Sequence, residues 1–139
     1  MIKLCKVTKT YPNGTTALRD INIHIEKGEF VFFVGASGAG KSTLAKLLLR
    51  EELPTRGEIL VNGVDIVKLK RRQIPYYRRG IGVVFQDFRL LPEKTVYENV
   101  AFAMRVVEEP RREILRQGPS VLHLVGLSPK SRMKPSQLS

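Results

Sequence analysis

The chain has 139 residues, of which 24 are Lys or Arg and 13 are Asp or Glu, so its formal charge is +11. This length suits one domain or part of one, and 42% apolar with 27% charged residues is a globular composition that argues against intrinsic disorder. The single cysteine, Cys5, excludes an internal disulfide framework. No apolar run approaches the roughly 20 residues of a membrane helix, and the N-terminus has no signal-peptide pattern, so we expect a cytosolic location.

The positive charge is concentrated in two segments that contain no acidic residue. Six basic residues fall within 66–86 and four within 114–139. Lys and Arg neutralise phosphates, so these segments suit an anionic membrane, an acidic partner or a nucleic acid. Zinc-finger spacing, a helix-turn-helix pattern and RNP-like aromatic motifs are all missing from the sequence, and we therefore do not expect nucleic-acid binding.

Three segments predict antiparallel strands. Residues 2–9 predict a first strand that ends in the turn at residues 11–14. Residues 21–26 alternate strictly between isoleucines and polar residues, which predicts a strand with one buried face. Residues 58–66 place Asn62-Gly63 between two short apolar runs, which is a strong hairpin signal.

Two continuously apolar runs, residues 30–34 and 81–85, predict strands that are covered on both faces, as in a parallel sheet. The first run leads through a glycine-rich segment into residues 41–50, where leucines recur without a helix breaker. The combination of a buried strand, a glycine loop and a helix behind an antiparallel strand pair predicts an α/β fold.

Two further helices are expected in the second half of the chain. The capping box from Thr95 to Glu98 predicts a helix that extends to about Val107. Pro110 suits the first turn of another helix, which should end near Gly126. Within it, Gly118-Pro119 predicts a kink or a split.

The glycine-rich segment reads Gly35-Ala-Ser-Gly38-Ala-Gly40-Lys41-Ser42, which matches the phosphate-loop pattern G-x-x-x-x-G-K-[ST] at every defined position. The glycines let successive N–H groups point into one concavity, and the helix N-terminus adds a partial positive charge. We expect Lys41 to contact the β- and γ-phosphates of a nucleotide and Ser42 to coordinate Mg²⁺ through its hydroxyl.

Over essentially its whole length the chain resembles the ATP-binding subunits of ABC transporters. Tyr11 matches the aromatic residue that stacks on adenine in that family, Gln86 matches the Q-loop glutamine that reaches toward Mg²⁺ and the attacking water, and Thr43 resembles a residue near the α-phosphate. The resemblance implies a P-loop ABC nucleotide-binding domain with an N-terminal antiparallel β subdomain. The residues expected to bind Mg-ATP are Tyr11, Gly35, Ser37, Gly38, Ala39, Gly40, Lys41, Ser42 and Thr43, with Ser42 and Gln86 directed toward Mg²⁺.

The same resemblance divides the chain into an ATP-binding core at residues 1–87 and the start of a helical subdomain at residues 88–139. Leu138-Ser139 would begin the family's Leu-Ser-Gly-Gly signature, so the chain looks cut inside that motif. The Walker B aspartate, the catalytic glutamate and the switch histidine of the family follow the signature. We therefore expect a full-length relative to be an ATPase and the chain as given to be inactive, with Gln86 as its catalytic candidate.

Residues 85–100 and the basic run Lys-Leu-Lys-Arg-Arg at 68–72 are similar to the FtsE group of bacterial cell-division ATP-binding proteins. This resemblance implies a membrane subunit like FtsX as the partner, a homodimer of the full-length ATP-binding subunit, and a place at the cytoplasmic face of the plasma membrane. An exporter or lipoprotein-release ATPase is the alternative within the family.

Other classes fit the sequence less well. A GTPase would carry D-x-x-G and N-K-x-D, and neither occurs. A small-molecule kinase could share the phosphate loop, but the antiparallel strand pair and Tyr11 ahead of it are not expected there. A basic nucleic-acid-binding module, in which the phosphate loop is incidental, is the alternative from another class.

Overall fold

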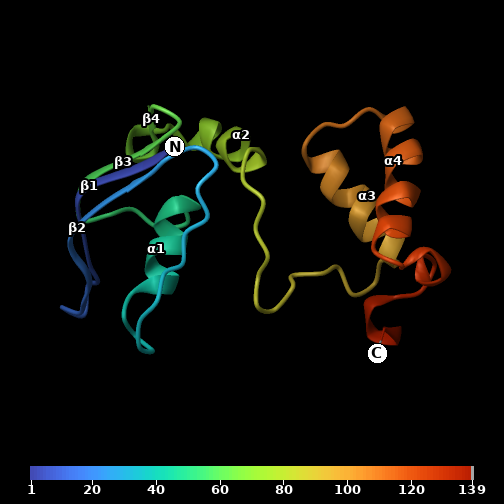
Figure 1. Cartoon of the computed structure of the whole chain (residues 1–139), viewed down its shortest axis with the longest axis horizontal. Coiled ribbons are helices and arrows are strands. Elements are labelled where there is room, and N and C mark those ends of the chain that lie inside the picture. The colour runs from blue at the N-terminus through green and yellow to red at the C-terminus, as the bar shows by residue number, and fades with distance from the viewer. Residues whose placement is uncertain (139) are drawn as a thin grey trace. The chain divides into compact units, whose positions relative to one another are not determined.

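The computed structural model describes residues 1–138, which form two compact units, one over residues 1–81 and one from residue 82 onward. Figure 1 follows the chain from the N-terminus in blue to the C-terminal part in red. Across the described residues, none of the helices combines the length and the apolar character needed to cross a lipid bilayer.

The first unit is built on a four-stranded antiparallel sheet with the strand order β2-β1-β3-β4 (Figure 1). Strand β1 (Ile2–Thr10) pairs with β2 (Thr16–Ile25) on one side and with β3 (Arg56–Val61) on the other. The short β4 (Val64–Asp65) returns along β3 directly after Asn62-Gly63. The predicted antiparallel strands and the predicted hairpin are therefore confirmed.

A hydrophobic core joins this sheet to helix α1 (Lys41–Leu48). The alternation predicted for β2 is present, because Ile21, Ile23 and Ile25 are half-buried while Asn22 and His24 are exposed. Burial of one aliphatic side chain contributes about 1.5–3 kcal/mol, so a core of this size fixes the helix on the sheet. The buried core residues are Leu4, Val7, Leu18, Leu44, Leu47, Ile59 and Ile66.

The segment after β4 covers the C-terminal end of α1 and consists of η1 (Ile66–Lys68), η2 (Arg71–Gln73) and α2 (Ile74–Arg79). The Tyr77 hydroxyl donates to the carbonyl of Leu48 at 2.5 Å, and the Arg78 guanidinium donates to the carbonyls of Leu49 and Arg50 at 2.8 and 3.0 Å. The last carbonyls of a helix have no intrahelical donors, so α2 supplies them. Burial of the phenol also raises the pKa of Tyr77.

The two buried strands expected from the sequence do not form. Residues 30–34 have no regular secondary structure, and their side chains are exposed, from 42% for Val31 to 92% for Val34. Residues 81–85 are irregular as well, with Val84 also 92% exposed. A strand needs backbone hydrogen-bond partners, and within residues 1–138 no strand pairs with either run. The prediction was wrong here because local apolar character does not supply a neighbouring strand.

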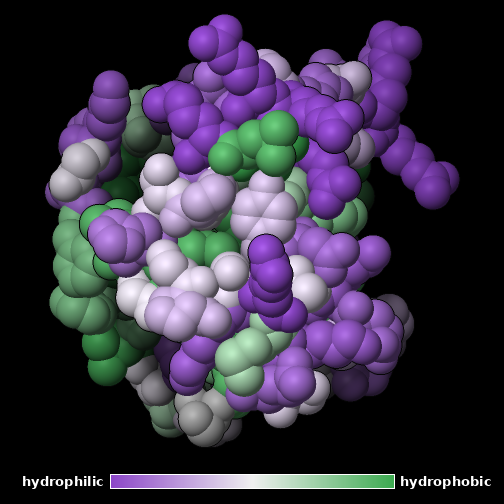
Figure 2. All heavy atoms as spheres, turned by 90° about the vertical axis from the view of Figure 1, so that its right-hand side faces the viewer, coloured by the Kyte–Doolittle hydropathy of each residue, from purple (hydrophilic) through white to green (hydrophobic). Residues whose placement is uncertain are grey.

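The second unit is a packed pair of helices, α3 (Val96–Val106) and α4 (Arg111–Leu124), followed by the short turns η3 (Ser128–Lys130) and η4 (Pro135–Gln137). The predicted capping box is confirmed, since Thr95 Oγ1 accepts from the Glu98 N–H at 3.2 Å and Glu98 Oε2 accepts from the Thr95 N–H at 2.8 Å. The face drawn in Figure 2, on the side of these helices, is mostly hydrophilic, as expected of helices with one solvated face.

Helix α4 runs through Gly118-Pro119 without a break, contrary to the predicted split. Proline removes one backbone donor from the helix, but the Ser120 hydroxyl adds a hydrogen bond to the Arg116 carbonyl at 3.0 Å. Gly118 itself is buried and lies against the ring of Tyr97 in α3. Packing against α3 therefore stabilises the helix across the residues that local propensity would break.

Candidate functional site

The phosphate loop lies directly against strand β2. Gly40 is the N-cap of α1 and has a left-handed backbone with φ of 89°. A Cβ atom at this position would lie 2.4 Å from the carbonyl oxygen of Ala17 and 2.8 Å from Cδ2 of Leu18, both in β2. Only glycine fits such an approach, so the second defined glycine of the motif, Gly40, fixes the loop on the sheet.

The Lys41 ammonium folds back over the loop from the first turn of α1. It donates to the carbonyls of Gly35 and Ala36 at 2.5 and 2.8 Å. The loop and the first turn of α1 form an open concavity of about 240 Å³, whose lining residues are Ser37, Gly38, Gly40, Lys41, Ser42 and Thr43. Lys41 therefore lines the concavity and also contacts the carbonyls at the start of the loop.

The N-terminus of α1 is open to an anion. Its first turn contains no acidic residue, and within residues 1–138 no side chain caps it. The first N–H groups of a helix have no intrahelical acceptors and carry a partial positive charge. Together with Lys41, these groups can bind a polyphosphate with little rearrangement.

A magnesium ion fits this arrangement only as the companion of a bound phosphate. The Ser42 side chain is exposed beside the loop and offers one hydroxyl ligand. In the part of the chain that the structure describes, no cluster of three His, Cys, Asp or Glu residues could hold a metal by itself. Mg²⁺ commonly takes most of its oxygen ligands from phosphates and water, so one serine is sufficient protein anchorage.

Tyr11 and Thr43, two of the expected nucleotide contacts, touch each other. Tyr11 follows the end of β1, and its hydroxyl lies 3.2 Å from Oγ1 of Thr43, the third residue of α1. The same hydroxyl donates to Glu52 Oε1 at 3.4 Å. Thr43 is buried, with 8% of its surface exposed. The structure therefore brings the proposed base-stacking residue and the phosphate loop together through side chains.

Sequence reasoning missed Glu52, which is the centre of a small charged cluster. Its Oε2 lies 3.2 Å from Lys9 Nζ and its Oε1 lies 3.3 Å from Lys46 Nζ. Desolvation acts to raise the pKa of Glu52, but its contacts with Lys9, Tyr11 and Lys46 outweigh burial and leave this pKa below its ordinary value. One feature of the sequence could have pointed to Glu52. An acidic residue shortly after the C-terminus of a helix is unfavourable beside the helix dipole unless cations accompany it.

Gln86 belongs to the second unit, whereas the other expected site residues belong to the first. It is exposed and begins a turn in which the Phe88 N–H donates to the Phe85 carbonyl at 3.0 Å. Phe88 and Arg89 both have left-handed backbones, with φ of 55° and 46°. Two successive non-glycine residues in this region are uncommon and mark the segment as tightly constrained.

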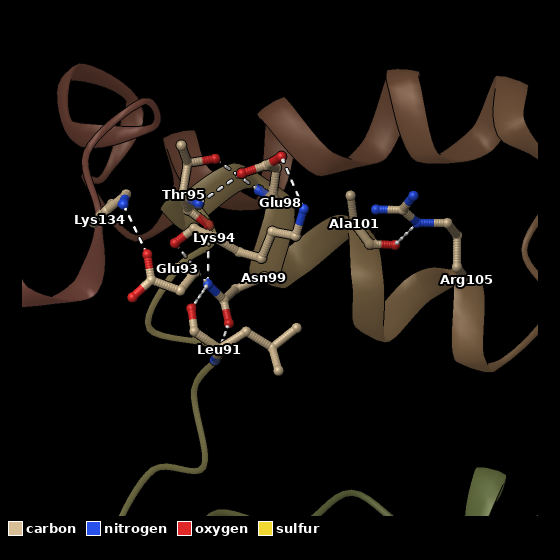
Figure 3. A network of polar contacts seen from close by, with 9 residues as sticks. All are labelled: Leu91, Glu93, Lys94, Thr95, Glu98, Asn99, Ala101, Arg105 and Lys134. Carbon is tan, nitrogen blue, oxygen red and sulfur yellow. Dashed lines mark hydrogen bonds and ion pairs between the residues drawn. The ribbon is translucent and has the colours of Figure 1, made fainter.

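The chain beyond that turn is held by Asn99 of α3 (Figure 3). Asn99 Oδ1 accepts from the Leu91 N–H at 2.8 Å, and its Nδ2 donates to the carbonyls of Leu91, Lys94 and Thr95 at 3.1, 3.3 and 3.0 Å. Lys134 adds an ion pair with Glu93 at 3.0 Å. The Asn99 amide and this ion pair therefore hold residues 91–95, which lead into α3.

Comparisons with known proteins identify the family of the chain. A family model described as ABC transporter matches residues 18–139. The cell division ATP-binding protein FtsE of Bacillus subtilis (strain 168) is 53% identical over 139 residues, which are all of this chain and 61% of that protein. The methionine import ATP-binding protein MetN of Helicobacter hepaticus (strain ATCC 51449 / 3B1) is 43% identical over 139 residues, all of this chain and 40% of that protein.

A solved dimeric structure of the ATP-binding cassette MJ0796, described as a post-hydrolysis state bound to ADP and Pi, superposes with a TM-score of 0.88 at 35% identity. The superposition covers 100% of this chain and 63% of that one. The chain thus spans about three-fifths of the length of the FtsE relative and of this cassette, and two-fifths of the MetN relative. The expected fold class, an α/β P-loop domain with an N-terminal antiparallel β subdomain, is confirmed, and the chain belongs to the ABC transporter family of ATP-binding proteins.

Proposed function

We propose that the chain is the nucleotide-binding part of an ABC-type ATPase subunit and that it binds Mg-ATP. The observation that carries the proposal is the open N-terminus of α1, with the Lys41 ammonium held across the loop at the carbonyls of Gly35 and Ala36. This arrangement concentrates donors and positive charge where a triphosphate would lie.

Each site residue has a role in this proposal. The ring of Tyr11 stacks on adenine, Thr43 contacts the α-phosphate, and Lys41 contacts the β- and γ-phosphates. Residues 35–40 supply backbone N–H groups, and Ser42 supplies a hydroxyl to Mg²⁺. Mg²⁺ held there would supply positive charge that neutralises the phosphates. Gln86 is proposed to orient the attacking water.

We further propose that residues 1–87 act as the ATP-binding core and residues 88–139 as the beginning of the helical subdomain. Hydrolysis requires a metal-binding aspartate and a carboxylate that positions water, and the resemblance to the family places both after its signature motif. Turnover is therefore proposed for the longest form of the protein that the gene encodes, as a homodimer.

The proposed process is bacterial cell division, with an FtsX-like membrane subunit as partner at the cytoplasmic face of the plasma membrane. Support comes from the 53% identity with an FtsE protein, which exceeds the 43% identity with a methionine import protein. The second candidate is an import ATPase of the MetN type, since that relative also matches the whole chain.

Calorimetry with Mg-ATP tests the binding role. Lys41→Ala should weaken affinity about tenfold or more, because a lost charge-assisted contact is worth about 1.5–3 kcal/mol. Lys27→Ala, in an exposed turn of the same unit, is the matched control and should bind as the wild type does. Equal affinity in the Lys41→Ala variant would remove this lysine from the site.

Genetic complementation tests the proposed role in cell division. The complete gene should restore division in Bacillus subtilis that lacks FtsE, and the Lys41→Ala version should not. Rescue of methionine uptake in a strain without MetN, together with no effect on division, would favour the import ATPase instead.

A further inference from the structure

We propose that Glu52 is a positioning residue of the nucleotide site, where it couples recognition of the base by Tyr11 to recognition of the α-phosphate by Thr43. The inference rests on the proposed function, since it takes Tyr11 and Thr43 as nucleotide contacts. Tyr11, Thr43 and Glu52 come from three separate segments of the chain and meet through their side chains.

The contacts of Tyr11 hold its ring at both ends and over one face. The backbone N–H of Tyr11 donates to the Thr15 carbonyl at 2.9 Å, which holds one end of the residue. The hydroxyl lies 3.2 Å from Thr43 Oγ1 and 3.4 Å from Glu52 Oε1, which holds the other end. Both hydroxyl contacts lie at the ring edge, and the Lys9 ammonium lies over the ring, 5.1 Å from its centroid. The face opposite Lys9 is therefore the one that we propose for a stacked base.

Glu52 is itself held by one cation from each element that it connects. Lys9 lies in β1, just before Tyr11, and its ammonium is 3.2 Å from Oε2. Lys46 lies in α1, one turn after Thr43, and its ammonium is 3.3 Å from Oε1. The Glu52 side chain is only 22% exposed, so these interactions are screened less than those of a surface pair. The carboxylate therefore links the end of β1 to the helix that begins at the phosphate loop.

Removal of Glu52 should weaken binding of the base more than binding of the phosphates. Without the carboxylate, the like charges of Lys9 and Lys46 lose their shared partner and the Tyr11 hydroxyl keeps only Thr43. Lys41 makes its contacts with the carbonyls of Gly35 and Ala36 and not with this cluster. A polyphosphate that carries no base should therefore bind the variant as well as it binds the wild type.

The test compares Mg-ATP with Mg-tripolyphosphate by calorimetry, in the longest form of the protein that the gene encodes. Glu52→Ala should weaken ATP binding about five- to tenfold and leave tripolyphosphate binding unchanged. Glu52→Gln keeps an acceptor for the Tyr11 hydroxyl, so its ATP affinity should fall between those of Glu52→Ala and the wild type. Glu58→Ala is the matched control, because this exposed glutamate contacts only Lys68 at 3.8 Å among the ion pairs of the described chain.

A double-mutant cycle gives a second measurement that does not depend on the alanine variant alone. Tyr11→Phe removes the hydroxyl that contacts Glu52, so adding Glu52→Gln to Tyr11→Phe should cost less ATP affinity than Glu52→Gln does in the wild type. Additive losses would contradict the coupling even if Glu52→Ala fails to fold.

The outcomes separate the inference from the function on which it rests. Unchanged ATP affinity in Glu52→Ala, or equal losses for ATP and tripolyphosphate, would overturn the inference and leave nucleotide binding intact. A wild-type protein that binds neither ligand would overturn the proposed function, and the inference would fail with it.

Discussion

Gly118 of α4 packs directly against the ring of Tyr97 in α3, where a Cβ atom at position 118 would lie 2.9 Å from the tyrosine Cε2. Glycine inside a helix costs about 1 kcal/mol relative to alanine. Its presence at this position is explained by the close approach of the two helices. The backbone N–H of Tyr97 also donates to the Ser131 carbonyl at 2.9 Å, which joins the first turn of α3 to the segment that follows α4.

Gly118→Ala should therefore destabilise the protein, although the same change stabilises most helices. Overpacking typically costs about 1–3 kcal/mol, against the gain of about 1 kcal/mol in helix propensity. Thermal unfolding should show a lower midpoint for Gly118→Ala, and the addition of Tyr97→Leu should recover part of the loss. A higher midpoint for the single variant would mean that the ring moves aside at no cost.

Glu98 should make stability depend on pH in the acid range. Hydrogen bonding with the backbone N–H and then the side chain of Thr95, followed by the charges of Lys94 and Arg105, holds the pKa of Glu98 below its ordinary value of 4.5. A lowered folded-state pKa stabilises the protein fully above the unfolded value, and this stabilisation is lost as pH falls through the folded pKa. The unfolding midpoint should therefore drop more between about pH 6 and about pH 3 for the wild type than for Glu98→Gln. Parallel drops would show that Glu98 contributes nothing to acid sensitivity.

Asn99 should limit the local opening of the segment that leads into α3, residues 91–95. Asn99→Ala removes the acceptor of the Leu91 N–H and the donor to three carbonyls. Each lost hydrogen bond is worth about 0.5–1.5 kcal/mol, so hydrogen exchange at the Leu91 amide should accelerate about tenfold or more. Asn13→Ala is the control, because Asn13 lies in the first unit, where it accepts from the nearby Thr15 N–H at 3.0 Å, and its removal should leave Leu91 protected.

Local patterns predicted those parts of the fold that depend on neighbouring residues. The alternation in β2, the hairpin at Asn62-Gly63 and the capping box at Thr95 are each settled within a few positions of the chain. The glycine loop before Lys41 belongs to the same class, since its glycines and the helix that follows are adjacent.

Features that depend on distant partners could not be predicted in this way. The contact of Tyr11 with Thr43 and Glu52 requires the docking of α1 on the sheet, and no spacing rule encodes that docking. The contact of Gly118 with Tyr97 has the same origin, and there a residue that suggests a helix break instead permits close packing. The prediction of a buried strand at residues 30–34 was wrong for the opposite reason. The apolar pattern of a buried strand is present in the sequence, but within residues 1–138 no neighbouring strand pairs with it, and the side chains are exposed.

The exposed apolar run at residues 30–34 leads to the last prediction. One pair of substitutions in this run should improve the behaviour of residues 1–139 alone and destabilise the longest form of the protein that the gene encodes. Phe32 and Val34 are 77% and 92% exposed, and Phe32 makes only an edge-to-face ring contact with Phe30 at 4.8 Å among the aromatic pairs of the described residues. Exposed apolar clusters of this kind promote association. Residues 1–139 alone should therefore self-associate and bind a hydrophobic dye, and Phe32→Ser with Val34→Thr should reduce both effects.

In the longest form that the gene encodes, the same two substitutions should destabilise the protein. We expect the run to be covered there by neighbouring strands, as its continuous apolar character indicates. Truncation of a buried phenylalanine costs about 3–5 kcal/mol, which is a large share of a typical total of about 5–15 kcal/mol. Light scattering and dye fluorescence measure the effect on residues 1–139, and denaturant unfolding measures the effect on the longer form. Leu124→Ser is the control, since this 84% exposed leucine at the end of α4 should change neither form much. If the paired substitutions leave the longer form as stable as the wild type, residues 30–34 are not a buried strand in either form.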